Sequence, residues 1–170
     1  RQRQMCIRDS CKVAFKLQLH AEVNTAYGVI EKELAQMGIS KPSIKDLSQA
    51  VIRIRQSKLP DPSVLGNAGS FFKNPIVSLE VLHHIQQAYD DVPSYPAGED
   101  HVKLAAGWLI EKAGWKGKRI GNVGVHDLQA LVLVNHGGGT GIEIYDLSEK
   151  IIQDIQNKFG VMLEREVNIY

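Results

Sequence analysis

The stretch Gly66-Asn-Ala-Gly-Ser-Phe-Phe-Lys-Asn-Pro75 predicts a loop that presents the hydroxyl of Ser70. Glycine is usually kept for tight turns or for places where the backbone closely approaches another group. Pro60 and Pro62 before the stretch, and Pro75 at its end, bar a continuous helix through it. Read by itself, a short Gly-x-x-Gly-Ser match marks an ordinary loop more often than a site, because short motifs carry a high false-positive risk.

The composition is that of a globular protein of ordinary character. Hydrophobic residues make up 44% of the chain and charged residues 23%, and the net charge of +1 gives no reason to expect a nucleic-acid or membrane partner. The sequence contains neither an apolar run long enough to span a membrane nor a secretory signal pattern. Cys6 and Cys11 match no metal-ligand spacing, so we expect no metal site and a reducing, cytoplasmic location.

Residues 1–10 do not fit the pattern that follows them. They show no clear period, and Met5-Cys-Ile-Arg-Asp-Ser10 resembles the in-frame translation of a common sequencing adapter. We interpret this segment as an assembly artefact and exclude it from fold reasoning. The chain is then expected to be a C-terminal fragment of a longer protein.

Residues 11–60 predict one strand followed by two helices. Apolar and polar residues alternate over Cys11–Leu19, which is the period of a half-buried strand. Val29–Met37 has helical spacing and is followed by Gly38, a typical C-cap. Ser43–Asp46 resembles a capping box at the start of a second helix. The apolar face of that helix would comprise Leu47, Val51, Ile52 and Ile54.

The remaining residues predict a compact α+β unit, separated from the first part by a break near Pro60–Ser63. The glycine-rich turn His136–Gly141 lacks the pattern and the context of a phosphate-binding loop. The expected elements are helices at 78–89, 103–113 and 146–159, strands at 123–126, 130–134 and 161–170, and a loop at 90–100.

Four blocks, in order, give a more specific indication than any single motif. Besides Gly66–Pro75 they are Ala105-Ala-Gly-Trp-Leu-Ile-Glu-Lys-Ala-Gly114, Gly124-Val-His-Asp-Leu-Gln-Ala-Leu-Val-Leu-Val-Asn135 and Phe159-Gly-Val-Met-Leu-Glu-Arg-Glu-Val167. Together they resemble the UDP-N-acetylenolpyruvoylglucosamine reductase (MurB) family, from about residue 12 to the end. The resemblance implies that residues 11–60 end a FAD-binding domain, 61–165 form the substrate-binding domain, and 166–170 return toward the flavin domains.

The resemblance also implies a chemistry, namely reduction of the enolpyruvyl group of a UDP-sugar in peptidoglycan synthesis. Ser70 matches the family's proton donor, and Glu166 matches its second catalytic residue, which stabilises the enolate. Without the resemblance, Glu166 would be read as a solvated glutamate paired with Arg165. The sequence alone does not link Ser70 to Glu166.

Further residues are expected at the substrate. Lys58 and Asn74 correspond to family positions that contact it, and the resemblance favours Tyr95 and Gln129 as well. Arg55 lies near Lys58 and is a further candidate, since cations suit a substrate that carries two phosphates and a carboxylate. A cation at a helix end is also often only a solvated charge.

The cofactors implied by the resemblance are FAD and NADPH. The sequence contains no glycine-rich pyrophosphate-binding segment, so the flavin-binding residues within these 170 are unknown and the fragment alone is expected to be inactive. Two other readings stay open: a non-catalytic module that binds a nucleotide-sugar, and a purely structural α+β domain. The sequence does not define an oligomeric state.

Overall fold

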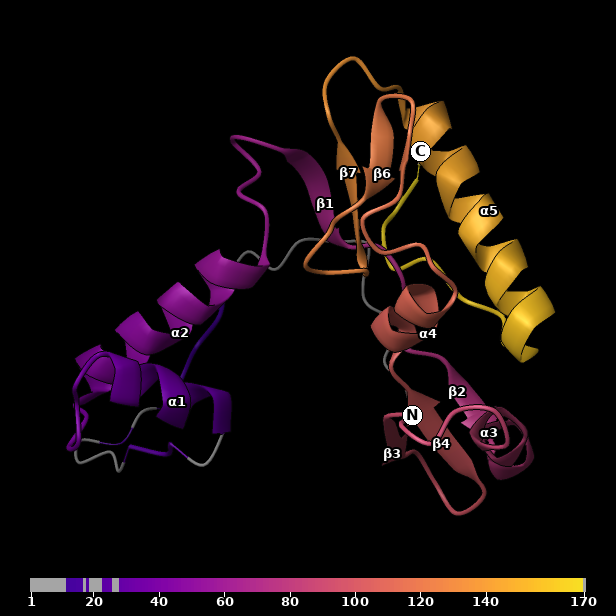
Figure 1. The fold of residues 1–170 in the computed structure, drawn as a ribbon. Helices are drawn as coiled ribbons and strands as arrows, with labels where there is room; N and C mark the ends of the chain where they lie inside the picture. The colour runs from indigo at the N-terminus through magenta and orange to yellow at the C-terminus, as the bar shows by residue number, and fades with distance from the viewer. Residues whose placement is uncertain (1–11, 17, 19–22, 26–27, 170) are drawn as a thin grey trace. The chain divides into compact units, whose positions relative to one another are not determined.

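The computed structural model describes residues 12–16, 18, 23–25 and 28–169. The chain divides into two compact units, residues 1–54 and 55–170, and the division falls inside the second helix. Figure 1 shows the elements of both units. The predicted domain boundary after residue 60 stays a prediction.

The first unit contains helix α1, Gly28–Gln36, and most of helix α2, Ile44–Lys58. The predicted cap of α2 is confirmed, because the Asp46 carboxylate accepts hydrogen bonds from the Ser43 backbone N–H and hydroxyl. The predicted C-cap of α1 is confirmed as well, since Gly38 has a φ of +72°. Leu34 and Ala50 are the buried hydrophobic residues among those described in this unit.

One expectation for the first unit is wrong where the structure can test it. The described residues of the predicted strand Cys11–Leu19 form no strand, and the side chains of Val13 and Phe15 are 63% and 80% exposed. A strand is stable only when its backbone pairs with a neighbour, and no described strand pairs with these residues. On the predicted apolar face of α2, Val51 and Ile52 are exposed, whereas Leu47 and Ile54 are half-buried.

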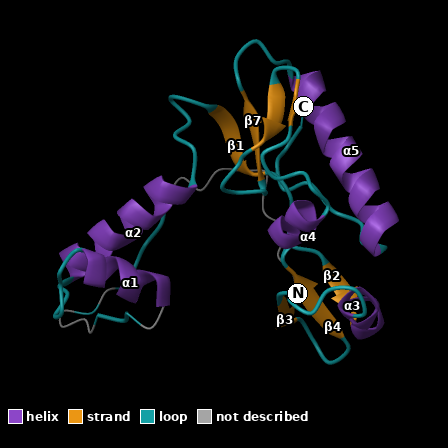
Figure 2. Cartoon of the chain, in the orientation of Figure 1, coloured by secondary structure: helices purple, strands orange, loops and turns teal. Residues whose placement is uncertain are grey.

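The second unit is built from two antiparallel sheets and three helices, which confirms the predicted α+β class (Figure 2). One sheet has the order β1-β7-β6-β5 and the other the order β2-β4-β3. The strands are β1 Gly66–Ser70, β2 Ile76–Ser78, β3 Ser94–Pro96, β4 His101–Leu104, β5 Arg119–Ile120, β6 Val123–Val125 and β7 Val132–Asn135. The helices are α3 Leu79–Gln86, α4 Ala106–Lys112 and α5 Gly141–Phe159.

Helix α5 organises the core of this unit by packing against α4, β6 and β7. Its Leu147, Ile151 and Ile155 are buried, as their helical spacing predicted. The helix begins five residues earlier than predicted because Thr140 and Glu143 form a complete capping box. It ends, as predicted, before Gly160, whose φ is +68°. None of the described helices is both long and apolar enough to cross a membrane.

Three predicted elements of the second unit are corrected by the pairing of strands. Residues 66–70, expected as a loop, form edge strand β1, which pairs with β7. The expected loop 90–100 contains β3, which pairs with β4. The expected terminal strand 161–170 makes only a single bridge among its described residues, between Phe72 and Arg165. The partners of β1 and of the terminal segment are distant in sequence, so local patterns did not show them, whereas β3 pairs with β4 in a hairpin of nearby residues.

Candidate functional site

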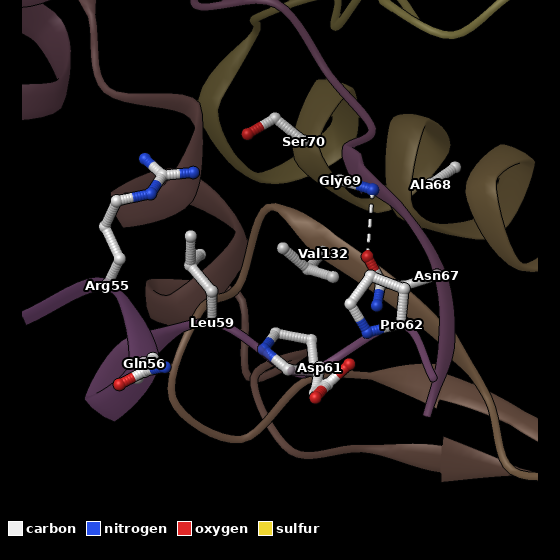
Figure 3. A pocket seen from close by; sticks show the side chains of 11 residues that line it. Arg55, Gln56, Leu59, Asp61, Pro62, Asn67, Ala68, Gly69, Ser70 and Val132 are labelled. Atoms are coloured by element: carbon white, nitrogen blue, oxygen red, sulfur yellow. Dashed lines mark hydrogen bonds between the residues drawn. The ribbon is translucent and has the colours of Figure 1, made fainter. Parts of the chain in front are cut away.

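A cleft of about 960 Å³ opens beside Ser70 in the second unit (Figure 3). It lies between the end of α2, the proline-containing connector that follows, and strand β1, with one residue of β7 at its base. Its lining residues are Arg55, Gln56, Leu59, Pro60, Asp61, Pro62, Asn67, Ala68, Gly69, Ser70 and Val132.

The backbone at the end of β1 is fixed by a turn around Asn67. The Asn67 side chain accepts a hydrogen bond from the Gly69 N–H at 3.1 Å and donates one to the Leu65 carbonyl at 2.9 Å. Gly69 has a φ of +73°, and the register with β7 shifts before Ser70, which then pairs with Val132. This bulge determines where the exposed Ser70 side chain is presented to the cleft.

Two charged residues of opposite sign line the cleft. In Figure 3 the guanidinium of Arg55, in the last turn of α2, extends toward the part of the cleft where the Ser70 hydroxyl lies. The Asp61 carboxylate accepts hydrogen bonds from the hydroxyl and the backbone N–H of Ser63, which lower the pKa of Asp61 below its ordinary value. The hydrogen bonds from Ser63 thus hold the Asp61 carboxylate against the backbone of the connector.

The terminal segment with Glu166 runs beside the residues that follow Ser70. The Glu166 N–H donates to the Phe71 carbonyl at 2.9 Å, and the Lys73 N–H donates to the Glu164 carbonyl at 2.8 Å. The backbone of Glu166 is therefore bonded to the residue next to Ser70. The Glu166 side chain is exposed and is not among the cleft-lining residues, so its approach to the Ser70 hydroxyl stays a prediction.

The other candidate substrate-binding residues lie outside the cleft lining. Lys58 is exposed at the end of α2, Tyr95 is 58% exposed on β3, and Gln129 precedes β7. Asn74 has a local task, because its Oδ1 accepts a hydrogen bond from the Ala106 N–H at 2.9 Å. This bond caps α4, whose N-cap residue Ala105 has no side-chain cap of its own. The substrate contacts of these four candidates stay predictions.

Several cleft residues had been given no role by sequence reasoning, among them Gln56, Asp61, Asn67 and Val132. The Asn-x-Gly spacing of Asn67 and Gly69 is a known turn signal and would have indicated the fixed backbone before Ser70. Val132 joins the cleft only through the pairing of β1 with β7, for which the sequence contains no local signal.

The glycine-rich turn before α5 does not fit a dinucleotide phosphate. The Asn135 Oδ1 already accepts hydrogen bonds from the backbone N–H groups of Gly137 and Gly139, at 2.9 and 3.1 Å. Those donors are the groups that a phosphate would need. Within the part of the chain that the structure describes, no cluster of metal-ligating side chains occurs either.

Comparison with known proteins gives one consistent result. Residues 61–170 match the family described as UDP-N-acetylenolpyruvoylglucosamine reductase, C-terminal domain. Proteins named UDP-N-acetylenolpyruvoylglucosamine reductase from Pseudomonas syringae and Chromobacterium violaceum are 52% and 53% identical, over 94% and 91% of this chain. The matches cover 47% and 45% of those two relatives, so the chain spans about half their length.

A crystal structure of the reductase from Thermus caldophilus (MurB) is similar with a TM-score of 0.45 and 20% identity. That similarity covers 75% of this chain and 34% of the other. The family match extends over more than half of the chain and includes the cleft-forming strand β1, the capped helix α5 and the terminal segment with Glu166. The chain therefore belongs to the UDP-N-acetylenolpyruvoylglucosamine reductase family and contains its C-terminal domain.

Proposed function

We propose that this chain supplies the substrate-binding part of a cytoplasmic reductase that converts UDP-N-acetylglucosamine enolpyruvate to UDP-N-acetylmuramate in peptidoglycan synthesis. Family membership supports the reaction class. The observation that carries the proposal is the position of Ser70, at the end of a bulged strand, in a cleft that Arg55 also lines. The terminal segment with Glu166 is hydrogen-bonded to the residue after Ser70.

Ser70 is the proposed proton donor. The reduction adds a hydride at C3 of the enolpyruvyl double bond and a proton at C2, which is strongly basic once the hydride has arrived. A hydroxyl is a weak acid, yet it can protonate such a carbon if it is correctly placed. The turn formed by Asn67 and Gly69 and the pairing of Ser70 with Val132 hold the Ser70 backbone in one position, which supports this proposed role.

Glu166 is proposed to stabilise the enolate. Negative charge develops on C2 and on the neighbouring carboxylate during reduction, so a protonated or hydrogen-bonded carboxyl group would stabilise it and a bare carboxylate would repel it. The hydrogen bond from the Glu166 N–H to the Phe71 carbonyl keeps this residue close to the Ser70 backbone. The side chain must then turn toward the substrate.

The substrate carries two phosphates and a carboxylate, so it needs cations. Arg55 lines the cleft and is the cation best placed to bind this substrate. Lys58 follows it in the same helix end, and Asn74, Tyr95 and Gln129 are the further contacts that we propose. Arg55 can bind a phosphate through two parallel hydrogen bonds, which also orients the ligand.

FAD and NADPH are the proposed cofactors of the whole reductase. The glycine-rich turn before α5 does not provide a pyrophosphate cradle, since the N–H groups of Gly137 and Gly139 are bonded to Asn135. We therefore assign the FAD site mainly to polypeptide outside these 170 residues. The isolated chain should consequently bind substrate but not reduce it.

A hybrid protein tests the proposed reaction. The N-terminal half of the Pseudomonas syringae relative, which is 52% identical over the shared part, is joined to residues 12–170 of this chain. We expect NADPH oxidation that requires the enolpyruvyl UDP-sugar, whereas the 170-residue chain alone should show none. A folded, flavin-containing hybrid without substrate-dependent oxidation, or activity of the chain alone, would contradict the proposal.

The second candidate is a module that binds a nucleotide-sugar without reducing it. It is favoured by the fact that the cleft and Arg55 belong to this chain alone. Calorimetric titration of the 170-residue chain with the UDP-sugar distinguishes this candidate from a structural domain. We expect saturable binding that weakens about tenfold in Arg55→Ala, the worth of one charge-assisted hydrogen bond, and that is unchanged in the control Lys150→Ala on the exposed surface of α5.

A further inference from the structure

Arg165, the residue before Glu166, is held by one face of helix α5. Its Nε donates to the Ser148 Oγ at 2.8 Å, and its Nη2 contacts the Glu149 Oε1 at 2.5 Å. The guanidinium carbon also lies 4.5 Å from the centre of the Tyr145 ring. The three α5 residues Tyr145, Ser148 and Glu149 are spaced i, i+3 and i+4, so they lie on one face of the helix. We call this binding surface for the guanidinium the seat of Arg165.

This seat is built into the fold. Ser148 is completely buried, and its hydroxyl donates to the Tyr145 carbonyl at 2.6 Å while it accepts from Arg165. The hydrogen bond from Arg165 lowers the pKa of Glu149, which keeps the partner carboxylate charged. The Arg165 side chain is only 19% exposed. An exposed ion pair contributes little to the free energy of folding. A guanidinium that is hydrogen-bonded to a buried hydroxyl and to a carboxylate at once is held in one orientation.

The backbone of Arg165 is fixed from the opposite side. Arg165 forms an isolated bridge with Phe72, which is 1% exposed, and the two neighbouring hydrogen bonds join Glu166 to Phe71 and Lys73 to Glu164. A slip of one residue in such a pairing would turn each side chain to the other face. The Lys73–Glu164 ion pair joins two side chains across this pairing and is exposed.

We propose that Arg165 is a positioning residue for Glu166. Its seat on Tyr145, Ser148 and Glu149 sets the register of the terminal segment against Phe71–Lys73, and this register determines where Glu166 lies relative to Ser70. The inference rests on the proposed function of Glu166 for its catalytic consequence. The register itself can be tested without any catalysis.

Amide hydrogen exchange in the 170-residue chain tests the register. In Arg165→Ala the amides of Glu166 and Lys73 should exchange about tenfold faster, the effect of losing one charge-assisted hydrogen bond. The Val125 amide, which donates to the Lys118 carbonyl within the core sheet, should be unchanged. The control Arg119→Ala removes an exposed arginine and should change neither set. Unchanged protection of Glu166, or an equal rise at Val125, would overturn the proposal.

Kinetics of the hybrid reductase test the catalytic consequence. Misplacing Glu166 should lower kcat of Arg165→Ala by about tenfold to a hundredfold with KM within about twofold, because a small displacement weakens transition-state contacts most. Arg165→Lys keeps a charge for Glu149 but lacks the fork, so it should recover only part of kcat. A raised KM with unchanged kcat would overturn the proposal. An inactive wild-type hybrid would contradict the proposed function and leave the exchange result to decide the register.

Discussion

The two units of the chain have equally well-formed helix caps but very different interiors. Ser43 caps α2 in the first unit and Thr140 caps α5 in the second, each with an acidic residue three positions later. The first unit buries Leu34 and Ala50 among its described residues, whereas the second has one continuous hydrophobic cluster that extends from Phe71 to Leu163. Local chemistry thus forms helices in both units, whereas among the described residues an extended hydrophobic core is found in the second.

The largest expected effect compares the same substitution in the two units. Ile151→Ala in α5 removes a side chain with 0% exposure and should destabilise the second unit by about 2–5 kcal/mol, because it leaves a cavity. Ile52→Ala in α2 removes a side chain that is 43% exposed and should change the free energy of unfolding by less than about 1 kcal/mol. Denaturant unfolding followed by circular dichroism measures both.

The Ile52 variant is also the matched control, since both residues are helical isoleucines. Losses of equal size would contradict the distinction between the two interiors. A large effect of Ile52→Ala alone would show that the exposed face of α2 is covered in solution.

A smaller effect is expected where a glycine contacts the core. A Cβ added at Gly139 would lie 2.8 Å from the Asn135 Oδ1 and from the Val123 Cγ1, so Gly139→Ala should destabilise the second unit by about 1–3 kcal/mol. Gly28→Ala at the start of α1 meets nothing within 4 Å and should be neutral or slightly stabilising. Thermal unfolding of both variants checks this pair, and equal melting temperatures would refute it.

The smallest effect is a pH dependence of the cap of α5. The backbone N–H and the hydroxyl of Thr140 lower the pKa of Glu143 below its ordinary value. The stability that ionised Glu143 contributes to the folded state is therefore fully present above its unfolded pKa of about 4.3. It is lost as the pH falls through the lower pKa of Glu143 in the folded state. Glu143→Gln should lose less stability than the wild type between about pH 6 and about pH 3. Denaturant midpoints measured across this range test it, with Glu80→Gln on α3 as the charge control.

Elements bounded by short-range signals were the ones that the sequence predicted well. Ser78 caps α3, Gly38 follows α1 and Gly160 ends α5, and each of these residues acts on a backbone within four positions of itself. The apolar spacing of α5 also predicted its buried face. Such interactions can be seen in the sequence because every participant lies in one window.

Elements that depend on distant partners could not be predicted in this way. Strand β1 is rich in glycine and small residues, which favour a loop, yet its pairing with β7 makes it an edge strand. The terminal segment was expected as a regular strand that contains Leu163 and Val167, but among its described residues it makes one bridge, to Phe72. The cap that Asn74 provides for α4 likewise joins residues far apart in sequence.

The residues of the candidate site also differ in how well the sequence indicated their position. Ser70, whose role the family resemblance implies, and Arg55, chosen for its charge, both line the cleft. Lys58, Asn74, Tyr95 and Gln129, which the resemblance also suggested, are not among the lining residues. The sequence therefore indicated residues in and near the stretch Gly66–Pro75. The substrate contacts proposed for residues outside the cleft lining depend on where the substrate lies, which the sequence does not show.

The most direct test of the central claim is the kcat for substrate-dependent NADPH oxidation by the hybrid reductase with Ser70 replaced. If the Ser70 hydroxyl supplies the proton, Ser70→Ala should lower kcat by about a hundredfold to ten-thousandfold, whereas Ser70→Cys, which retains an acidic proton at the same position, should keep a larger part of it. A Ser70→Ala hybrid that reduces the enolpyruvyl substrate as fast as the wild type would contradict the account.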